Sequence, residues 1–317
     1  MKIKNNRLTV FAGAFICCFL WGSAFPGIKA GYRLWGISDG DTWQIIRFAG
    51  VRFFLAGILV ILFASLMRRR LLLPKRGELG KISFLSLFQT IGQYLFFYLG
   101  LAHTTGVNSA VVDSLTNFFA IITACLFMKM EKLTFRKVLG CVLGFAGVLT
   151  VNLTHEGFSF SPLGDGLVAL SALCYGISSV LIKKYSSQHD TVIFSGYQFL
   201  FGGIVMTIAG HAGVVISGGS SAGSVSMPGA AIILLYLALV SSVAYTLWGI
   251  LLKYNDVSGI SVFGFMNPVT GVLLSAILLG EADQLGIRYI AALLLVTAGI
   301  IIVNRKGRDT PLPCQQN

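Results

Sequence analysis

The sequence predicts an all-α membrane protein in which ten transmembrane helices form two inverted five-helix repeats. Two observations support this fold class. Of the 317 residues, 55% are hydrophobic and only 11% are charged, which leaves too few polar side chains to cover a soluble surface of that size. In addition, the second half of the chain repeats the apolar pattern and several motifs of the first half.

The repeat is clearest where two apolar runs are joined by a short acidic turn. In these segments Asn117 matches Asn267 and Glu131 matches Glu281, both at an offset of 150 residues. Solenoid and propeller units have shorter periods, roughly 20 to 50 residues. The chain therefore consists of two copies of one unit, which we place at residues 8–152 and 163–304, followed by a cytoplasmic tail at 305–317.

The match extends toward the N-terminus of each copy. Trp21-Gly22 corresponds to Tyr175-Gly176, and Gln93-Tyr94 corresponds to Ala244-Tyr245. The offsets differ by a few residues, as loop insertions between aligned helices would produce.

Each copy contains five apolar runs near the ~20 residues that cross a bilayer core. The expected helices lie at residues 8–30, 43–67, 81–101, 106–128, 134–152, 163–183, 191–214, 229–252, 258–279 and 286–304. Because five is odd, the second copy enters the membrane from the opposite side, so the repeats are inverted. The first run lacks a clear signal-peptide cleavage site, and we expect a retained helix.

The distribution of Lys and Arg predicts the orientation. With the N-terminus inside, 19 of the 24 basic residues fall in cytoplasmic segments, whereas the opposite loops hold only Arg33 and Arg288. Both termini are then cytoplasmic. The net charge of +12 is spread over these short loops and does not form the groove or stripe of a nucleic-acid binder.

No cofactor or metal is expected. The six cysteines lie mostly inside apolar runs, without a CxxC motif or a matching histidine spacing, so they predict neither a disulfide framework nor a metal site. There is no GxxxxGK[ST] sequence, so ATP does not drive the protein directly. The expected partners are a small-molecule substrate and the lipid bilayer, and nothing indicates an oligomeric state.

At this point the sequence resembles the EamA-like ten-helix members of the drug/metabolite transporter superfamily. The matching motifs are Trp21 to Phe25, Arg52-Phe53 followed by Leu55 to Gly57, and Asn267-Pro268 in a helix that ends at Glu281. The resemblance implies a central substrate cavity and transport of small metabolites, often amino acids and often outward. It also implies a proline in helix 4, where this chain has Phe118, so we expect a kink at Pro268 alone.

Asp113 and Arg52 are the deepest charged residues, at matching depths from the outer face, and we expect them to face each other. An ionisable group inside a bilayer costs roughly 2.5 to 3.5 kcal/mol even on mild scales, so each needs a partner or water. Asp113 would bind an amino group or a proton, and Arg52 would neutralise it or hold a carboxylate. The alternative is a structural ion pair that fixes helix packing.

Amide and aromatic side chains complete the candidate site. Asp113 and Asn117 share a helix face, as do Gln89 and Gln93, although such amides also form ordinary interhelical hydrogen bonds. Asn267 lies beside the proline that frees a carbonyl. The candidate substrate-binding residues are Asp113, Arg52, Asn117, Gln89, Gln93, Asn267, Tyr175, Gln198, Tyr245 and Trp248. Most other aromatic residues are expected to pack or to face lipid.

The expected function is export of amino acids or related compounds across a bacterial plasma membrane by alternating access. A carrier of drugs or nucleoside-like metabolites is the alternative, and one buried acid permits proton coupling. A membrane-embedded enzyme would need a convergent catalytic set, to which Asp113 with His103 is the nearest approach. A channel would need a filter-like repeat or a ring of charge, and the sequence contains neither.

Overall fold

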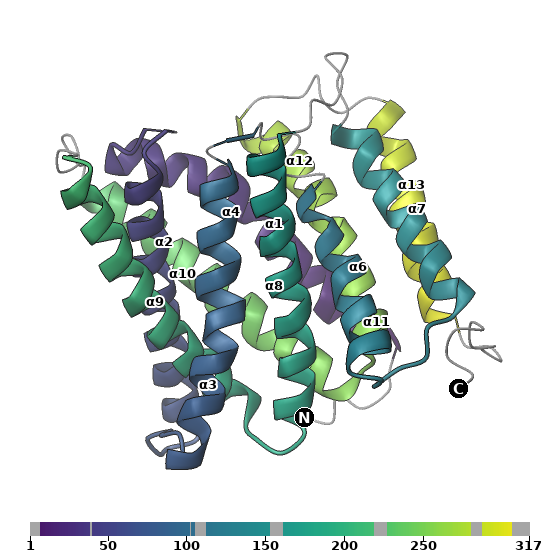
Figure 1. Ribbon diagram of the computed structural model, residues 1–317, viewed down its shortest axis with the longest axis horizontal. Coiled ribbons are helices and arrows are strands. Elements are labelled where there is room, and N and C mark those ends of the chain that lie inside the picture. The colour runs from purple at the N-terminus through teal and green to yellow at the C-terminus, as the bar shows by residue number, and fades with distance from the viewer. Residues whose placement is uncertain are drawn as a thin grey trace.

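The computed structural model describes residues 7–38, 40–101, 103–104, 112–152, 161–218, 227–279 and 287–305. Its α-helices are α1 (Arg7–Trp35), α2 (Thr42–Met67), α3 (Leu79–Ser86), α4 (Gln93–Leu101), α6 (Leu115–Ile122), α7 (Phe135–Asn152), α8 (Pro162–Ser186), α9 (Thr191–Ile216), α10 (Met227–Tyr254), α11 (Val257–Ser261), α12 (Met266–Leu279) and α13 (Ile287–Asn304). Figure 1 shows them packed as one bundle.

All ten predicted segments are helical where the structure describes them. Seven helices in the described part are long and apolar enough to cross a membrane, which agrees with a multi-pass membrane protein. The segment Leu115–Phe127 is apolar but shorter. The predicted count of ten spans therefore stays a prediction. The first helix continues to Trp35, past the predicted end at residue 30.

The packing of the helices repeats between the two halves. Helix α1 lies against α10 and α12, and its counterpart α8 lies against α4 and α6, which are the counterparts of α10 and α12. Helix α2 packs on its own counterpart α9, and α7 packs on its own counterpart α13 (Figure 1). This is the arrangement that a pseudo-twofold axis between two repeats produces, with the axis passing through the α2–α9 and α7–α13 contacts.

Glycines allow α2 and α9 to cross closely. A Cβ on Gly57 would lie 2.7 Å from the carbonyl oxygen of Gly196, and a Cβ on Gly203 would lie 2.8 Å from that of Gly50. Gly57 and Gly203 occupy equivalent positions at an offset of 146 residues, as do Gly50 and Gly196. The two close approaches are thus symmetry copies. Small residues at helix crossings are the usual basis of close packing in membranes.

Three spans depart from regular α-helix. Leu87–Gly92 and Thr123–Phe127 are π-helical, and Val262–Phe265 is a 3₁₀-helix. The 3₁₀ segment ends just before Pro268, whose missing N–H cannot bond the carbonyl of Gly264. The helix type changes where the proline was expected to act, while the kink itself stays a prediction.

Candidate functional site

Two tyrosines meet at the centre of the bundle. The hydroxyl oxygens of Tyr94 on α4 and Tyr245 on α10 lie 2.5 Å apart. These residues are repeat equivalents at an offset of 151 residues. Two equivalent side chains can touch only close to the axis that relates them, so the pseudo-twofold axis passes between the two hydroxyls.

A second equivalent pair stacks beside them. The rings of Phe53 on α2 and Phe199 on α9 are 5.3 Å apart and nearly parallel. Phe53 also lies 4.4 Å from Tyr94, and Phe199 lies 5.2 Å from Tyr245, measured between ring centroids. Four rings thus form a compact cluster around the axis, with each repeat contributing one tyrosine and one phenylalanine.

The Trp21-Gly22 and Tyr175-Gly176 motifs place two more aromatic residues on this cluster. The ring of Trp21 lies 5.0 Å from that of Tyr245, and Tyr175 belongs to the same buried cluster as Phe53, Phe199 and Tyr245. The adjacent glycines explain the position: a Cβ on Gly22 would collide with α12, and one on Gly176 would collide with α6. The glycine lets each helix approach its neighbour, and the preceding aromatic residue is directed to the centre.

Arg52 is a buried cation beside the cluster. It is 4% exposed, and its guanidinium carbon lies 4.4 Å from the ring centroid of Phe53 and 5.7 Å from that of Tyr94. Its Nε has no hydrogen-bond partner, and no ion pair to Arg52 occurs within the described residues. Contacts with aromatic faces contribute roughly 0.5 to 2 kcal/mol, less than the several kcal/mol that burying an ion costs.

Asp113, just before α6, is half-buried and forms no ion pair with Arg52 in the described part of the chain. Arg52 lies beside Tyr94, with its guanidinium carbon 5.7 Å from the ring centroid. The side chains of Asp113 and Arg52 are therefore not in direct contact, and the expectation that they face each other stays a prediction.

The candidate amides differ in their surroundings. Asn117 donates to the carbonyl of Ser114 at 3.3 Å and packs against Gly264. The side-chain oxygens of Gln93 and Asn267 are buried without a hydrogen-bond partner among the described groups. A buried polar atom in this condition costs about 1 to 3 kcal/mol, so both are suited to accept a hydrogen bond from a bound molecule.

Gln89 is 3% exposed and lies inside the π-helical turn Leu87–Gly92. The expectation that Gln89 and Gln93 share a face assumed regular α-helix, in which residues four apart align. A π turn closes its hydrogen bonds over five residues, so this alignment is altered. The sequence offers no simple signal for that turn.

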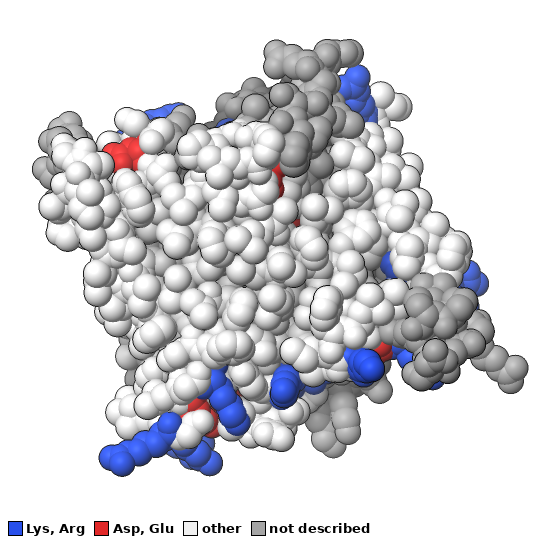
Figure 2. Space-filling view, in the orientation of Figure 1, with Lys and Arg blue, Asp and Glu red and all other residues white. Residues whose placement is uncertain are grey.

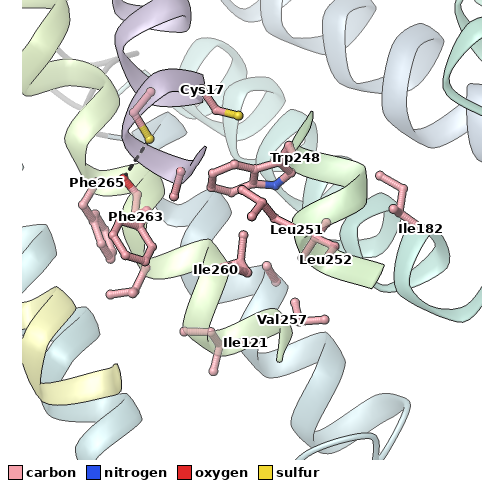
Figure 3. Packing of buried hydrophobic residues seen from close by; sticks show 14 of the residues in the cluster. Cys17, Ile121, Ile182, Trp248, Leu251, Leu252, Val257, Ile260, Phe263 and Phe265 are labelled. Atoms are coloured by element: carbon pink, nitrogen blue, oxygen red, sulfur yellow. Dashed lines mark hydrogen bonds between the residues drawn. The ribbon is translucent and has the colours of Figure 1, made fainter. Parts of the chain in front are cut away.

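Gln198 and Trp248 lie in close-packed surroundings. Gln198 is fully buried, and its Oε1 accepts a hydrogen bond from Thr90 at 2.6 Å. Trp248 is 2% exposed, and Figure 3 shows it surrounded by apolar residues of α10 and α11. Its ring also lies 5.0 Å from that of Trp21, so Trp248 borders the aromatic cluster from the side of the apolar core.

Glu131 joins the two repeats at the edge where α1 begins. Its carboxylate accepts hydrogen bonds from the backbone N–H groups of Val257 and Ser258 and from the Ser258 hydroxyl, the last at 2.5 Å. Lys137 donates to it at 3.0 Å. Glu131 therefore bonds both α7, the helix that follows it, and α11 of the second repeat. Its counterpart Glu281 lies outside the described residues.

A second polar network occupies the same edge. Asp190 caps α9 and pairs with Arg68. Burial raises the pKa of the Asp190 carboxyl. Hydrogen bonds from Arg68 and from the Val192 N–H lower the pKa by more than burial raises it, so it lies below its ordinary value. The ring of His189 contacts Glu78 at 2.8 Å and Lys81 at 2.9 Å.

A small pocket lies away from these candidates. It is formed by α3, α8 and α9, and it is lined by Leu85, Ile182, Tyr185, Ser186, Thr191, Phe194 and Ser195. None of these belongs to the aromatic cluster. The buried Arg52 and the unpartnered amides of Gln93 and Asn267 therefore define the candidate site better than this pocket does.

The fold and the buried polar centre define a multi-pass helical membrane protein built from two repeats. The family profile described as the EamA-like transporter family matches residues 8–153 and again residues 162–305. The chain belongs to the EamA-like transporter family, within the drug/metabolite transporter superfamily.

The chain is similar, over nearly its whole length, to proteins that are named as transporters. An uncharacterized transporter of Archaeoglobus fulgidus is 28% identical over 287 residues, covering 90% of this chain and 95% of that protein. The transporter YvbV of Bacillus subtilis is 27% identical, with 97% and 95% covered. The inner membrane transporter YedA of Escherichia coli K12 is 26% identical, with 97% of each covered.

A solved crystal structure shares the fold. It superposes with a TM-score of 0.76 at 19% identity, covering 94% of this chain and 97% of that one. Together with the family match, these relatives identify the chain as a membrane transporter.

Proposed function

We propose that this protein is a secondary transporter that exports amino acids or related zwitterions across the bacterial plasma membrane by alternating access. The observation that carries the proposal is the buried guanidinium of Arg52, which lies against Phe53 and Tyr94 without an ion-pair partner among the described residues. Asp113 supplies the opposite charge. A guanidinium matches a carboxylate in geometry and charge, and a carboxylate matches an ammonium group. The aromatic rings beside Arg52 suit the apolar part of a small metabolite.

The basic edge supports an orientation with both termini in the cytoplasm. Figure 2 shows Lys and Arg gathered along the lower edge of the molecule, where α1 begins and α13 ends in Figure 1. By the positive-inside rule this edge is cytoplasmic. The hydrogen bonds of Glu131 then hold the cytoplasmic ends of the repeats together, as expected of a state closed on that side.

The symmetry of the contacts supports alternating access. Exchanging the conformations of two inverted repeats leaves a contact between equivalent residues unchanged, so the Tyr94–Tyr245 pair persists in both states. Other contacts change. Gln198 accepts a hydrogen bond from Thr90, whereas the equivalent residues, Arg52 and Ser241, form no hydrogen bond with each other in the described part of the chain. Ser241 instead donates to the carbonyl of Leu237 within its own helix. In the opposite state Ser241 should approach Arg52.

Counterflow tests the proposal. Purified protein is reconstituted into liposomes preloaded with an unlabelled amino acid, and entry of the labelled compound is followed at two values of pH. Transient accumulation above equilibrium marks a carrier, since a channel gives none and an enzyme changes the compound. We expect accumulation by the wild type and its loss in Asp113→Asn. A wild type inactive with every amino acid but active with drugs or nucleosides would overturn the proposed substrate class.

The pH comparison addresses coupling. If Asp113 exchanges a proton with the substrate, counterflow by the wild type changes with pH and the change disappears in Asp113→Asn. If transport is facilitated diffusion, the rate is the same at both pH values. Equal counterflow by Asp113→Asn and by the wild type would show that Asp113 has only a packing role.

A further inference from the structure

The connection between α2 and the 3₁₀ turn Arg76–Glu78 has an unusual composition. Residues 68–76 read Arg-Arg-Arg-Leu-Leu-Leu-Pro-Lys-Arg, so three leucines lie between two basic clusters. We refer to residues 68–76 as the basic loop. It follows α2 at the basic edge of the molecule (Figure 2), next to the ends of the membrane helices.

The middle leucine fixes the loop to the bundle. Leu72 is 3% exposed, its N–H donates to Ser65 Oγ at 3.1 Å, and its carbonyl accepts from the hydroxyl of Tyr197 at 3.0 Å. In extended backbone, successive side chains point to opposite sides. Because Leu72 points inward, Leu71 and Leu73 point outward, and they are 70% and 62% exposed.

Basic residues flank these two leucines in the sequence. Arg68 pairs with Asp190, but Arg69, Arg70 and Arg76 are exposed and make no ion pair within the part of the chain that the structure describes. Arg69 also has a positive φ of 49°, a conformation that non-glycine residues seldom adopt and that turns the chain out of α2. The loop therefore holds two outward leucines between exposed arginines that make no ion pair with the described residues.

We propose that the basic loop is a binding surface for the anionic phospholipid headgroups of the bilayer. Leu71 and Leu73 enter the boundary between headgroups and acyl chains, and the neighbouring guanidinium groups bind lipid phosphates with charge-assisted hydrogen bonds. Basic residues near an anionic leaflet each contribute to such binding. Orientation by the positive-inside rule needs only the charges, so the anchored, outward leucines are the feature that points to lipid.

The second repeat provides a contrast. Its corresponding connection between α9 and α10, residues 217–226, contains no Lys or Arg and no Leu in its sequence. Since the repeats are inverted, that connection belongs to the opposite leaflet. The basic loop is thus a feature of one side of the membrane and not of the fold unit.

The test uses fluorescence quenching in lipid nanodiscs, in which both leaflets are accessible and transport is not needed. A fluorophore is attached at Leu73→Cys, or at Ser187→Cys as a control on the exposed connection between α8 and α9. Cys314→Ser removes one native thiol, and Cys17, Cys18, Cys125, Cys141 and Cys174 are buried. Quenchers are placed on the acyl chain of phosphatidylcholine, or on the headgroup of phosphatidylglycerol or phosphatidylcholine.

We expect the acyl-chain quencher to reach the Leu73 probe and not the Ser187 probe. The phosphatidylglycerol quencher should act roughly fivefold more strongly than its phosphatidylcholine analogue at the Leu73 probe. Replacing Arg69, Arg70, Lys75 and Arg76 by Gln should abolish this preference, while Arg68 and Leu72 keep the loop folded. Equal quenching at both probes, or a lipid preference that survives the four replacements, would overturn the proposal.

Discussion

At the scale of single residues, replacing Arg52 distinguishes a functional role of this buried charge from a structural one. A structural ion pair loses stability when one partner is removed, because the other charge is left buried and alone. Arg52 has no such partner among the described residues and rests on aromatic rings. Its removal should therefore impair substrate binding without destabilising the fold.

We predict that Arg52→Gln raises the KM for a zwitterionic substrate by roughly 10-fold to 100-fold, the loss expected for one charge-assisted hydrogen-bonded contact. Its melting temperature should equal or exceed that of the wild type. Arg47→Gln is the matched control, since Arg47 lies on the same helix and bonds Gln44 at 3.0 Å. A clear drop in the melting temperature of Arg52→Gln, with KM unchanged, would assign Arg52 to packing.

Asp190 gives a prediction on pH. Its folded pKa lies below the ordinary value, so its ion pair with Arg68 contributes stability that is fully present above the unfolded pKa of about 3.9 and is lost as pH falls through the folded pKa. Asp190→Asn keeps the helix cap and removes the charge. At neutral pH it should cost less than about 1 kcal/mol, because the pair is partly exposed.

Thermal unfolding in detergent at a series of pH values measures this difference. The gap between wild type and Asp190→Asn should stay constant from pH 7 to about pH 5 and close as pH falls below about 4. A gap that widens on acidification would contradict the assigned direction of the pKa.

At the scale of elements, the α2–α9 crossing depends on glycine. Gly57→Ala would bring a Cβ within 2.7 Å of the backbone of α9, so the helices must separate. We predict a loss of about 1 to 3 kcal/mol, typical of overpacking. The control Gly80→Ala has open space around it and should be neutral or slightly stabilising. Equal stabilities in a denaturation series would argue against tight packing at this crossing.

Some features of the helices could be predicted from the sequence and others could not. The helical segments and the corresponding tyrosines Tyr94 and Tyr245 follow from apolar runs and repeat offsets, because both are one-dimensional patterns. The contact between those tyrosines, and the bond from Glu131 to α11, depend on how helices distant in sequence pack. The residues of the π turn around Gln89 are ones that also occur in regular α-helix, so the turn could not be predicted from the sequence.

At the scale of the whole molecule, the central claim is that the two repeats exchange conformations around the Tyr94–Tyr245 axis. In the proposed cycle, contacts on the axis are kept, whereas the contact between Glu131 and Ser258, on the proposed cytoplasmic side, opens. The thiol of Cys125 lies 3.9 Å from the hydroxyl of Ser258. Ser258→Cys therefore places a second thiol next to Cys125. Oxidation of the two thiols to a disulfide would lock this contact closed.

Transport by oxidised and reduced Ser258→Cys tests this claim most directly. We predict that oxidation stops counterflow, that a reductant restores it, and that the control Ser258→Cys with Cys125→Ser is unaffected by either treatment. Full transport by a chain shown to carry the cross-link would contradict the account, because the cytoplasmic ends would then not need to separate.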